Sequence, residues 1–132
     1  MFNAIIVDDE AKSCKLLANL VKQYCPDIKI KGLANTVAEA LPLIHKEQPE
    51  ILFLDIQLNG QDGFNLLDEI PDKQFQVIFT TAYEQYAHKA FRYDAQDYLL
   101  KPIHIDELQS AVEKDSLGHH SEMPCVHTVR MR

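Results

Sequence analysis

The 132-residue chain lacks tryptophan, has only three cysteines, and contains no long apolar segment. Its longest uninterrupted apolar run is four residues, whereas a membrane-spanning helix needs about 20. The N-terminus carries no basic region ahead of its first apolar stretch, so we expect no secretory signal peptide. The three cysteines form no CxxC pair, which favours reduced thiols over a disulfide framework. Together these absences predict a cytoplasmic protein without a membrane segment.

Positive charge is also scarce, because 13 Lys and Arg residues oppose 20 Asp and Glu residues and leave a formal net charge of −7. An acidic surface repels phosphate backbones, and we therefore expect no direct nucleic-acid binding by this chain. The length and the ordinary composition fit one globular domain. We place this domain at residues 1–114 and interpret residues 115–132, which show no helical stripe, as a flexible tail or linker stub.

Short apolar segments alternate with helical patterns along the domain. The apolar segments predict buried strands at residues 4–7, 51–54, 77–79 and 98–100, and the alternating residues 28–31 predict a second strand with one more solvated face. The helical patterns lie at about residues 11–25, 36–45, 63–70, 83–91 and 106–114. Strands that alternate with helices predict an α/β fold, in which a parallel sheet is covered by helices on both faces.

Two of the helical patterns carry further detail. The first predicts an inward-facing stripe of apolar residues, namely Leu16, Leu17, Leu20, Val21 and Tyr24. In the second, Thr36 and Glu39 have the spacing of a capping box at the start of the helix. Pro42 lies inside the same pattern and should bend that helix rather than end it.

Charged and polar residues directly follow four of the predicted strands. Asp8 and Asp9 come after the first strand, Asp55 after the third, Thr81 after the fourth and Lys101 after the fifth. Because the carboxyl ends of parallel strands meet at one edge of a sheet, these side chains should converge there. Three clustered carboxylates repel one another, so the site needs cations: the Lys101 ammonium group and a divalent ion with oxygen ligands, such as Mg²⁺.

This set of residue types suits phosphoryl transfer. Mg²⁺ keeps coordination positions open for a phosphate oxygen, and a carboxylate beside it can attack phosphorus to form an acyl phosphate. A threonine hydroxyl and a lysine ammonium group at neighbouring strand ends can then bind the remaining phosphoryl oxygens.

The chain resembles the receiver domain of two-component response regulators over about residues 2–114. The resemblance rests on four segments in the family's order: Ile6-Val7-Asp8-Asp9-Glu10, Phe53-Leu54-Asp55-Ile56-Gln57-Leu58, Thr81-Ala82 and Lys101-Pro102. Residues 80–83 and 97–103 are most similar to the LytTR-type (LytR/AlgR-like) subfamily. The resemblance implies a doubly wound, flavodoxin-like fold: a five-stranded parallel sheet of strand order 2-1-3-4-5 with five helices.

The resemblance also implies roles for individual residues. Asp55 would be the phospho-acceptor, and Asp8, Asp9 and Asp55 would bind Mg²⁺ (or Mn²⁺) together with the backbone carbonyl of Gln57. Lys101 would contact the phosphoryl group and precede a cis peptide bond to Pro102.

Two further residues would form the switch that the resemblance implies. Thr81 would bond the phosphoryl group, and Tyr98 would be an aromatic switch residue that rotates toward the core in response. The chain departs from the family pattern at Asn59, where many receivers have proline, and at His104, where a helix-capping Asp or Asn is more usual. We therefore expect a flexible loop at 59–63 and a less sharply defined start of the last helix.

By this resemblance the chain is a phosphorylation-dependent switch rather than an enzyme with turnover, although it catalyses its own phosphotransfer and dephosphorylation. A sensor histidine kinase would be its partner, and phosphorylation would change partner binding to control a transcription output domain. A homodimer is a further expected response, through the face of the fourth helix, fifth strand and last helix. That face offers charges of both signs, as two-fold pairing requires: Lys89, Arg92, Lys114, Asp94, Asp97, Asp106, Glu107 and Glu113.

Three alternative functions remain open at this point. A small aspartate-nucleophile phosphatase would need a second acid two residues after the nucleophile, where this chain has Gln57. A flavodoxin-like cofactor binder would need a phosphate-binding loop after the first strand, where this chain has three acidic residues. A scaffold of the same fold could bind partners without phosphorylation, although it would have no need of the complete acidic set.

Overall fold

The computed structural model describes residues 1–117. Its elements, in chain order, are β1 (Phe2–Val7), α1 (Ala11–Tyr24), β2 (Ile28–Ala34), α2 (Val37–Glu47), β3 (Ile51–Leu54), β4 (Gln57–Leu58), β5 (Gln61–Asp62), α3 (Gly63–Asp68), β6 (Gln76–Thr81), the 3₁₀ helix η1 (Glu84–Tyr86), α4 (Ala87–Arg92), β7 (Asp97–Leu100) and α5 (Ile105–Leu117). Five strands form one parallel sheet in the order β2-β1-β3-β6-β7. This order confirms the predicted doubly wound topology. The predicted tail lies outside the described residues from position 118 onward.

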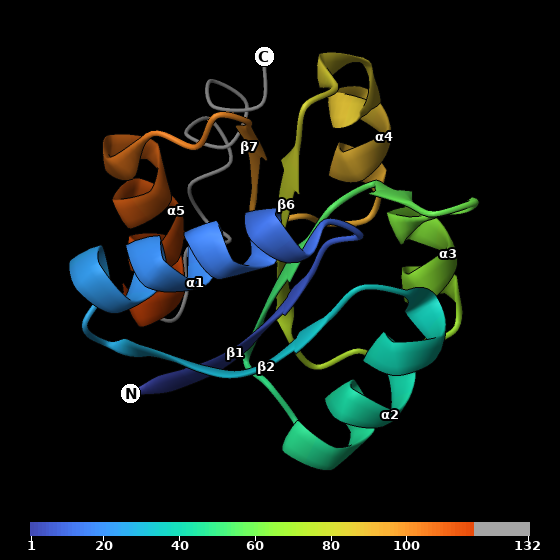
Figure 1. Ribbon diagram of the computed structural model, residues 1–132, viewed down its shortest axis with the longest axis horizontal. Helices are drawn as coiled ribbons and strands as arrows, with labels where there is room; N and C mark the ends of the chain where they lie inside the picture. The colour runs from blue at the N-terminus through green and yellow to red at the C-terminus, as the bar shows by residue number, and fades with distance from the viewer. Residues whose placement is uncertain (118–132) are drawn as a thin grey trace.

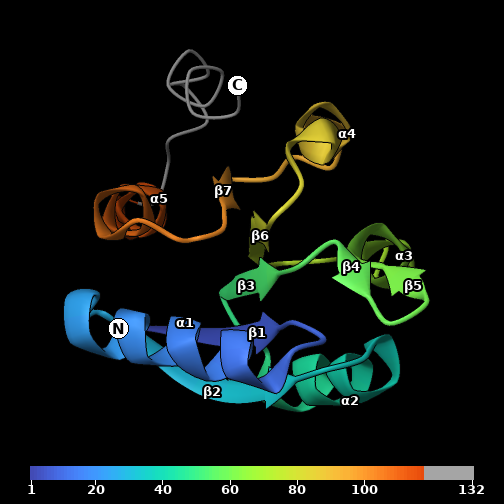
Figure 2. The ribbon, with the colours of Figure 1, turned by 45° about the horizontal axis from the view of Figure 1, so that its top comes forward.

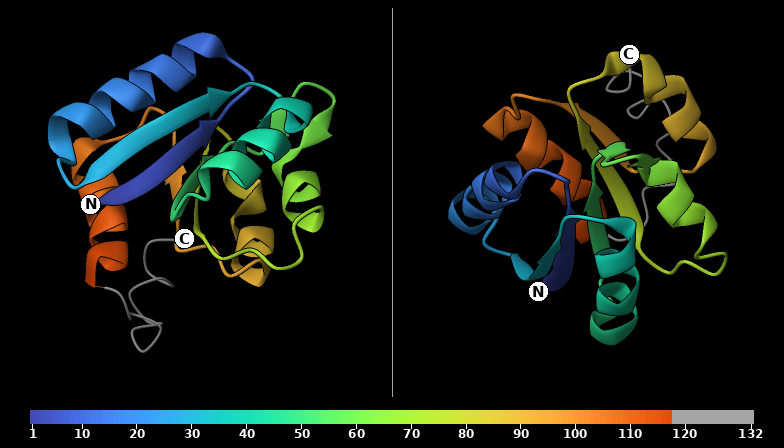
Figure 3. Two further views of the ribbon diagram at one scale, coloured as in Figure 1. Left: turned by 90° about the horizontal axis from the view of Figure 1, so that it is seen from below. Right: turned by 45° about the vertical axis from the view of Figure 1, so that its right-hand side comes forward.

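Helices cover both faces of the sheet. Helices α1 and α5 pack on one face, and α2, α3 and α4 pack on the other (Figures 1, 2 and 3). Successive side chains of a strand point to opposite faces, so Leu52 and Leu54 of β3 join the core beneath α2 and α3, while Ile51 and Phe53 join the core beneath α1 and α5. Burial on both faces explains why the central strands are continuous apolar runs.

Helix α1 departs from the predicted apolar stripe. Its buried residues are Cys14, Leu17 and Val21, which follow the i, i+3, i+7 spacing of one helical face. Leu16 is 62% exposed, so its predicted inward position is wrong. One residue along a helix corresponds to a rotation of about 100°, which turns Leu16 away from the sheet that Leu17 contacts.

Helix α2 begins and continues much as its sequence predicts. The Thr36 hydroxyl accepts a hydrogen bond from the Glu39 backbone N–H, at 3.1 Å. The Glu39 carboxylate returns to the N–H of Asn35 at 2.9 Å, one residue before the cap, so the capping box is not fully reciprocal. The helix continues past Pro42 and ends at Glu47.

The segment expected as a flexible loop forms a small hairpin instead. Strands β4 and β5 pair antiparallel and are joined by Asn59 and Gly60, both with positive φ (51° and 92°). A two-residue Asn-Gly turn with positive φ at both positions matches the twist of a hairpin. This hairpin leads from β3 directly into the capping box of α3, in which Asp62 and Asn65 each accept the other's backbone N–H.

Three other differences concern the second half of the domain. The predicted fourth helix is divided into η1 and the short helix α4. Helix α5 begins at Ile105, directly after His104, and reaches Leu117, three residues beyond the predicted end. Asp97, expected among the surface charges, is fully buried, and its carboxylate accepts the backbone N–H of Tyr98 at 2.8 Å.

Within residues 1–117, no helix is both long and apolar enough to span a membrane.

Candidate functional site

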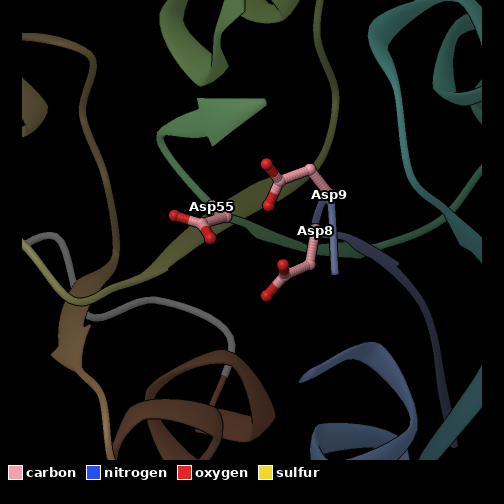
Figure 4. A group of neighbouring side chains, drawn as sticks. All are labelled: Asp8, Asp9 and Asp55. Atoms are coloured by element: carbon pink, nitrogen blue, oxygen red, sulfur yellow. The ribbon is translucent and has the colours of Figure 1, made fainter. Parts of the chain in front are cut away.

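Three carboxylates meet at the carboxyl edge of the sheet, as the strand ends predict. Asp8 and Asp9 follow β1, and Asp55 follows the neighbouring strand β3, whose ladder to β1 continues through a hydrogen bond from the Asp55 N–H to the Val7 carbonyl (2.9 Å). One carboxylate oxygen from each aspartate lies within 4.8 Å of the others (Figure 4). Asp8 and Asp55 are buried, whereas Asp9 is partly exposed.

Lys101 joins two of these carboxylates. Its Nζ atom donates to Asp8 Oδ2 at 2.7 Å and to Asp55 Oδ2 at 3.0 Å. Lys101 follows β7 and precedes a cis peptide bond to Pro102. Burial is the largest single influence on its pKa and lowers it, but the hydrogen bonds and charges of the two carboxylates together outweigh burial and raise the pKa. The ammonium group is therefore charged at neutral pH.

The charged form of Asp8 is disfavoured in this cluster. Burial, the largest cause, raises its pKa above the ordinary value of 3.8. The hydrogen bonds from Lys101 and from the Glu10 backbone N–H (3.0 Å) lower the pKa but do not offset burial, and the nearby charge of Asp55 raises it slightly. One lysine thus neutralises the cluster only in part, and a further cation would stabilise it.

We predict that Asp8→Asn raises the free energy of unfolding by about 1 kcal/mol at pH 7 without added Mg²⁺, because a neutral amide avoids the burial cost. With a raised pKa, folded Asp8 binds its proton more tightly than the unfolded chain does, so wild-type stability falls as the pH rises from 3.8 through the raised value. Below pH 3.8 the two proteins should therefore converge. Urea denaturation across this range measures the difference, with the exposed Asp27→Asn as control. Equal stability at pH 7 would contradict this account.

Two residues that the sequence did not single out hold the backbone of Asp8. The Asn35 side-chain amide donates to the Asp8 carbonyl at 2.8 Å, and the Cys14 thiol donates to the same oxygen at 3.5 Å. Burial raises the pKa of Cys14 to about 11, so the thiol keeps its proton. Asn35 directly follows β2, just as the acids follow their strands, and this position was the signal that could have identified it.

Gly63, at the start of α3, is a third residue that the sequence did not single out. A Cβ atom at this position would lie 2.5 Å from the Asp55 carbonyl oxygen, closer than real contacts allow. Its N–H donates to the Ile56 carbonyl at 2.7 Å. Glycine therefore allows α3 to begin directly against the backbone of the segment that follows β3.

Thr81 and Tyr98 both contact the backbone of Tyr83. The fully buried Thr81 hydroxyl accepts the Tyr83 N–H at 3.4 Å, and the Tyr98 hydroxyl donates to the Tyr83 carbonyl. Tyr98 is buried with its ring 6.1 Å from that of Phe79, and burial raises its pKa. Tyr83 itself is 43% exposed, so these contacts connect the buried strand ends with the surface.

Gln57 lies two residues after Asp55, in β4. Its backbone N–H donates to Asp55 Oδ1 at 3.3 Å, and its side-chain amide donates to the Tyr86 hydroxyl at 3.5 Å. The cluster fits a hard divalent cation, because it offers carboxylate oxygens from three aspartates at the same point. Of the predicted site residues, the structure brings Asp8, Asp9, Asp55 and Lys101 together directly.

A comparison with family models matches residues 4–113 to the response regulator receiver domain. Among curated proteins, the sensory transduction protein LytT of Enterococcus faecalis is 39% identical over 116 residues, and that of Bacillus subtilis is 35% identical over 116 residues. The transcriptional regulatory protein BtsR of Salmonella typhi is 37% identical over 115 residues. Each alignment covers 86% of this chain and 48% of the relative, so the chain spans about half the length of the curated relatives it matches.

Solved structures show the same fold. A LuxR-family DNA-binding response regulator from Staphylococcus aureus aligns with a TM-score of 0.77 and 28% identity, over 86% of this chain and 98% of the other. The response regulatory domain of mrkE from Klebsiella pneumoniae aligns with a TM-score of 0.76 and 27% identity, over 85% and 93%. The extent of the family match and the identity to relatives agree with the sequence resemblance. The chain therefore belongs to the response regulator receiver domain family.

Proposed function

We propose that this domain accepts a phosphoryl group on Asp55 from a phosphohistidine of a sensor histidine kinase. The observation that carries the proposal is the buried Asp55 carboxylate, which shares Lys101 with Asp8 and has an oxygen within 4.8 Å of oxygens of Asp8 and Asp9. In the transfer, an Asp55 oxygen forms a bond to phosphorus while the phosphorus–nitrogen bond breaks, and the histidine nitrogen keeps the electron pair.

Asp8, Asp9, Asp55 and the backbone carbonyl of Gln57 would hold a Mg²⁺ ion at this site. When bound, the ion supplies the positive charge that three carboxylates and an incoming phosphoryl group require. The chain's own contribution is to orient Asp55, through Lys101 and the Gln57 N–H, and to bury it from bulk water. Lys101 and the Thr81 hydroxyl are the donors that we assign to the phosphoryl oxygens.

The response to phosphorylation would pass through Thr81 and Tyr98. Because both hydroxyls bond the backbone of Tyr83, drawing Thr81 toward a phosphoryl group changes one contact of Tyr83 and frees Tyr98 to rearrange. Helix α4, which follows Tyr83 and η1 along the chain, exposes Phe91 (54%) and the charged Arg92. This surface supports a phosphorylation-promoted homodimer. The name of one relative, the transcriptional regulatory protein BtsR, supports transcription control by the whole protein.

Beryllofluoride, a reversible mimic of the phosphoryl group, tests the proposal on the full 132-residue chain. We expect ¹⁹F NMR to show bound beryllofluoride when Mg²⁺ is present and none when EDTA removes it, because the acidic cluster cannot hold an anion without a cation. Sedimentation of the same samples measures any dimer. No bound signal with Mg²⁺, or equal binding in EDTA, would refute the proposed site. Hydrolysis of phosphate monoesters with turnover would indicate a phosphatase instead.

A further inference from the structure

The hydroxyl of Thr80, in β6, is buried without a hydrogen-bond partner. Thr80 is 1% exposed, and among the described side chains its Oγ1 atom is the only buried nitrogen or oxygen with no partner. An unpaired buried hydroxyl costs free energy, whereas valine would fill the same volume with no polar atom. The hydroxyl is therefore a feature of this fold that packing does not explain.

The strand register places Thr80 next to the acidic cluster. Phe79 pairs with Leu54, so the next step along both strands brings Thr80 beside Asp55. Thr80 itself pairs with Leu99 on the other side, two residues before Lys101.

Side-chain alternation then decides which face the hydroxyl occupies. Ile78 and Leu99 belong to the core beneath α1 and α5, and alternation puts Thr80 on that same face. Lys101 follows Leu99 by two residues and shares this face, where it reaches Asp8 and Asp55. Thr81 alternates to the opposite face, with Phe79. Thr80, rather than Thr81, is therefore the threonine in the layer of the Lys101 ion pairs.

Hydrogen-bond donors to Asp55 are few in this layer. Lys101 donates a hydrogen bond to Asp55 Oδ2, but it also donates to Asp8 at the shorter distance of 2.7 Å. The Gln57 N–H donates to Asp55 Oδ1 at 3.3 Å. A phosphoryl group on Asp55 brings new oxygens that compete for the Lys101 N–H groups. The Asp55 oxygen that stays a carbonyl is then the one left to bind Mg²⁺, and its second lone pair can accept a hydrogen bond. The Thr80 hydroxyl has no partner and is adjacent to Asp55 in register.

We propose that Thr80 is a positioning residue whose hydroxyl hydrogen-bonds the Asp55 carboxyl group when Asp55 carries a phosphoryl group. In the unmodified domain this hydroxyl has no hydrogen-bond partner. The inference rests on the proposed phospho-acceptor role of Asp55, and it adds a buried contact on the α1/α5 side of the sheet.

The isosteric variant Thr80→Val tests this inference by beryllofluoride titration in the presence of Mg²⁺, followed by ¹⁹F NMR. Loss of one hydrogen bond to the mimic-bearing carboxyl group should raise the half-saturating concentration about tenfold. Thr80→Ser, which keeps the hydroxyl, should stay within about twofold of the wild type. Without beryllofluoride, Thr80→Val should be as stable as the wild type or more stable, because it removes an unsatisfied hydroxyl.

Equal half-saturation of Thr80→Val and wild type would show that Thr80 only fills space and would overturn the inference. If Thr80→Val does not fold, Thr80→Ser and Thr80→Ala give the same comparison, since they differ only by the hydroxyl; similar values for these two would also overturn it. Failure of the wild type itself to bind beryllofluoride would refute the proposed function instead, so the two failures are distinguishable.

Discussion

Asp55→Asn is expected to abolish covalent phosphoryl incorporation from a small phosphoryl donor in the presence of Mg²⁺. An amide oxygen cannot form the acyl phosphate, and no other buried carboxylate lies at the end of β3. The fold should persist with a change in the free energy of unfolding of about 1 kcal/mol or less, because the amide keeps an oxygen for Lys101 and relieves repulsion with Asp8. Intact-mass spectrometry measures the incorporation, and urea denaturation measures the stability.

The exposed Asp72→Asn provides a matched control, since it makes the same chemical change in the loop that follows α3. This variant should incorporate phosphate at the wild-type rate. Incorporation by Asp55→Asn at the rate of the Asp72 variant would show that another residue is the phospho-acceptor.

Lys101→Met is expected to destabilise the fold by about 2 kcal/mol at pH 7, because it leaves two buried carboxylates without their shared cation. We expect less than for a fully buried pair because 23% of the lysine side chain is exposed. Loss of the Lys101 hydrogen bond removes a cause that lowers the Asp8 pKa, so that pKa rises further. Stability of the variant should therefore recover as the pH falls through the new pKa, where protonation removes the repulsion.

Thermal denaturation between pH 4 and pH 8 checks this prediction, with Lys29→Met on the exposed side of β2 as a control for the loss of one positive charge. A loss of stability that is equal for both variants, or that does not change with pH, would contradict the shared-cation account. Mg²⁺ should restore part of the lost stability in Lys101→Met, because it neutralises the same carboxylates.

The acidic cluster could be predicted because each of its strands is a short apolar run buried on both faces and ends abruptly in an acid. The proximity of Asp8 and Asp55 follows from the rule that the carboxyl ends of parallel strands lie at one edge of the sheet. The same rule would also have identified Asn35, which directly follows β2, but Cys14 and Gly63 could not be predicted in this way, because they act on the backbone around the acids. Backbone contacts depend on the exact approach of neighbouring elements, which residue patterns do not specify.

Other differences have equally local causes. The Asn59-Gly60 turn carries a clear hairpin signal, yet its strands are only two residues long and show no alternation. Leu16 was predicted to belong to the apolar stripe because leucine is apolar. Only the orientation of α1 on the sheet shows that this side chain faces solvent. The role proposed for Thr80 rests on its unpaired hydroxyl and on the strand register, which residue types do not show, whereas its neighbour Thr81 fits the family pattern.

The hydroxyls of Thr81 and Tyr98 both bond the backbone of Tyr83, whose ring is exposed. We therefore expect a change at the buried strand ends to be coupled energetically to the position of Tyr83. Suppose that the phosphoryl group shifts these contacts and that a partner binds Tyr83 in the shifted position. The free energy by which the phosphoryl group favours the partner then equals the free energy by which the partner favours the phosphoryl group. A binding partner at this surface would therefore tighten the binding of the phosphoryl mimic by the same factor by which the mimic tightens the binding of the partner. The affinity for the phosphoryl mimic, compared with and without a partner, therefore also measures how strongly that partner recognises Tyr83.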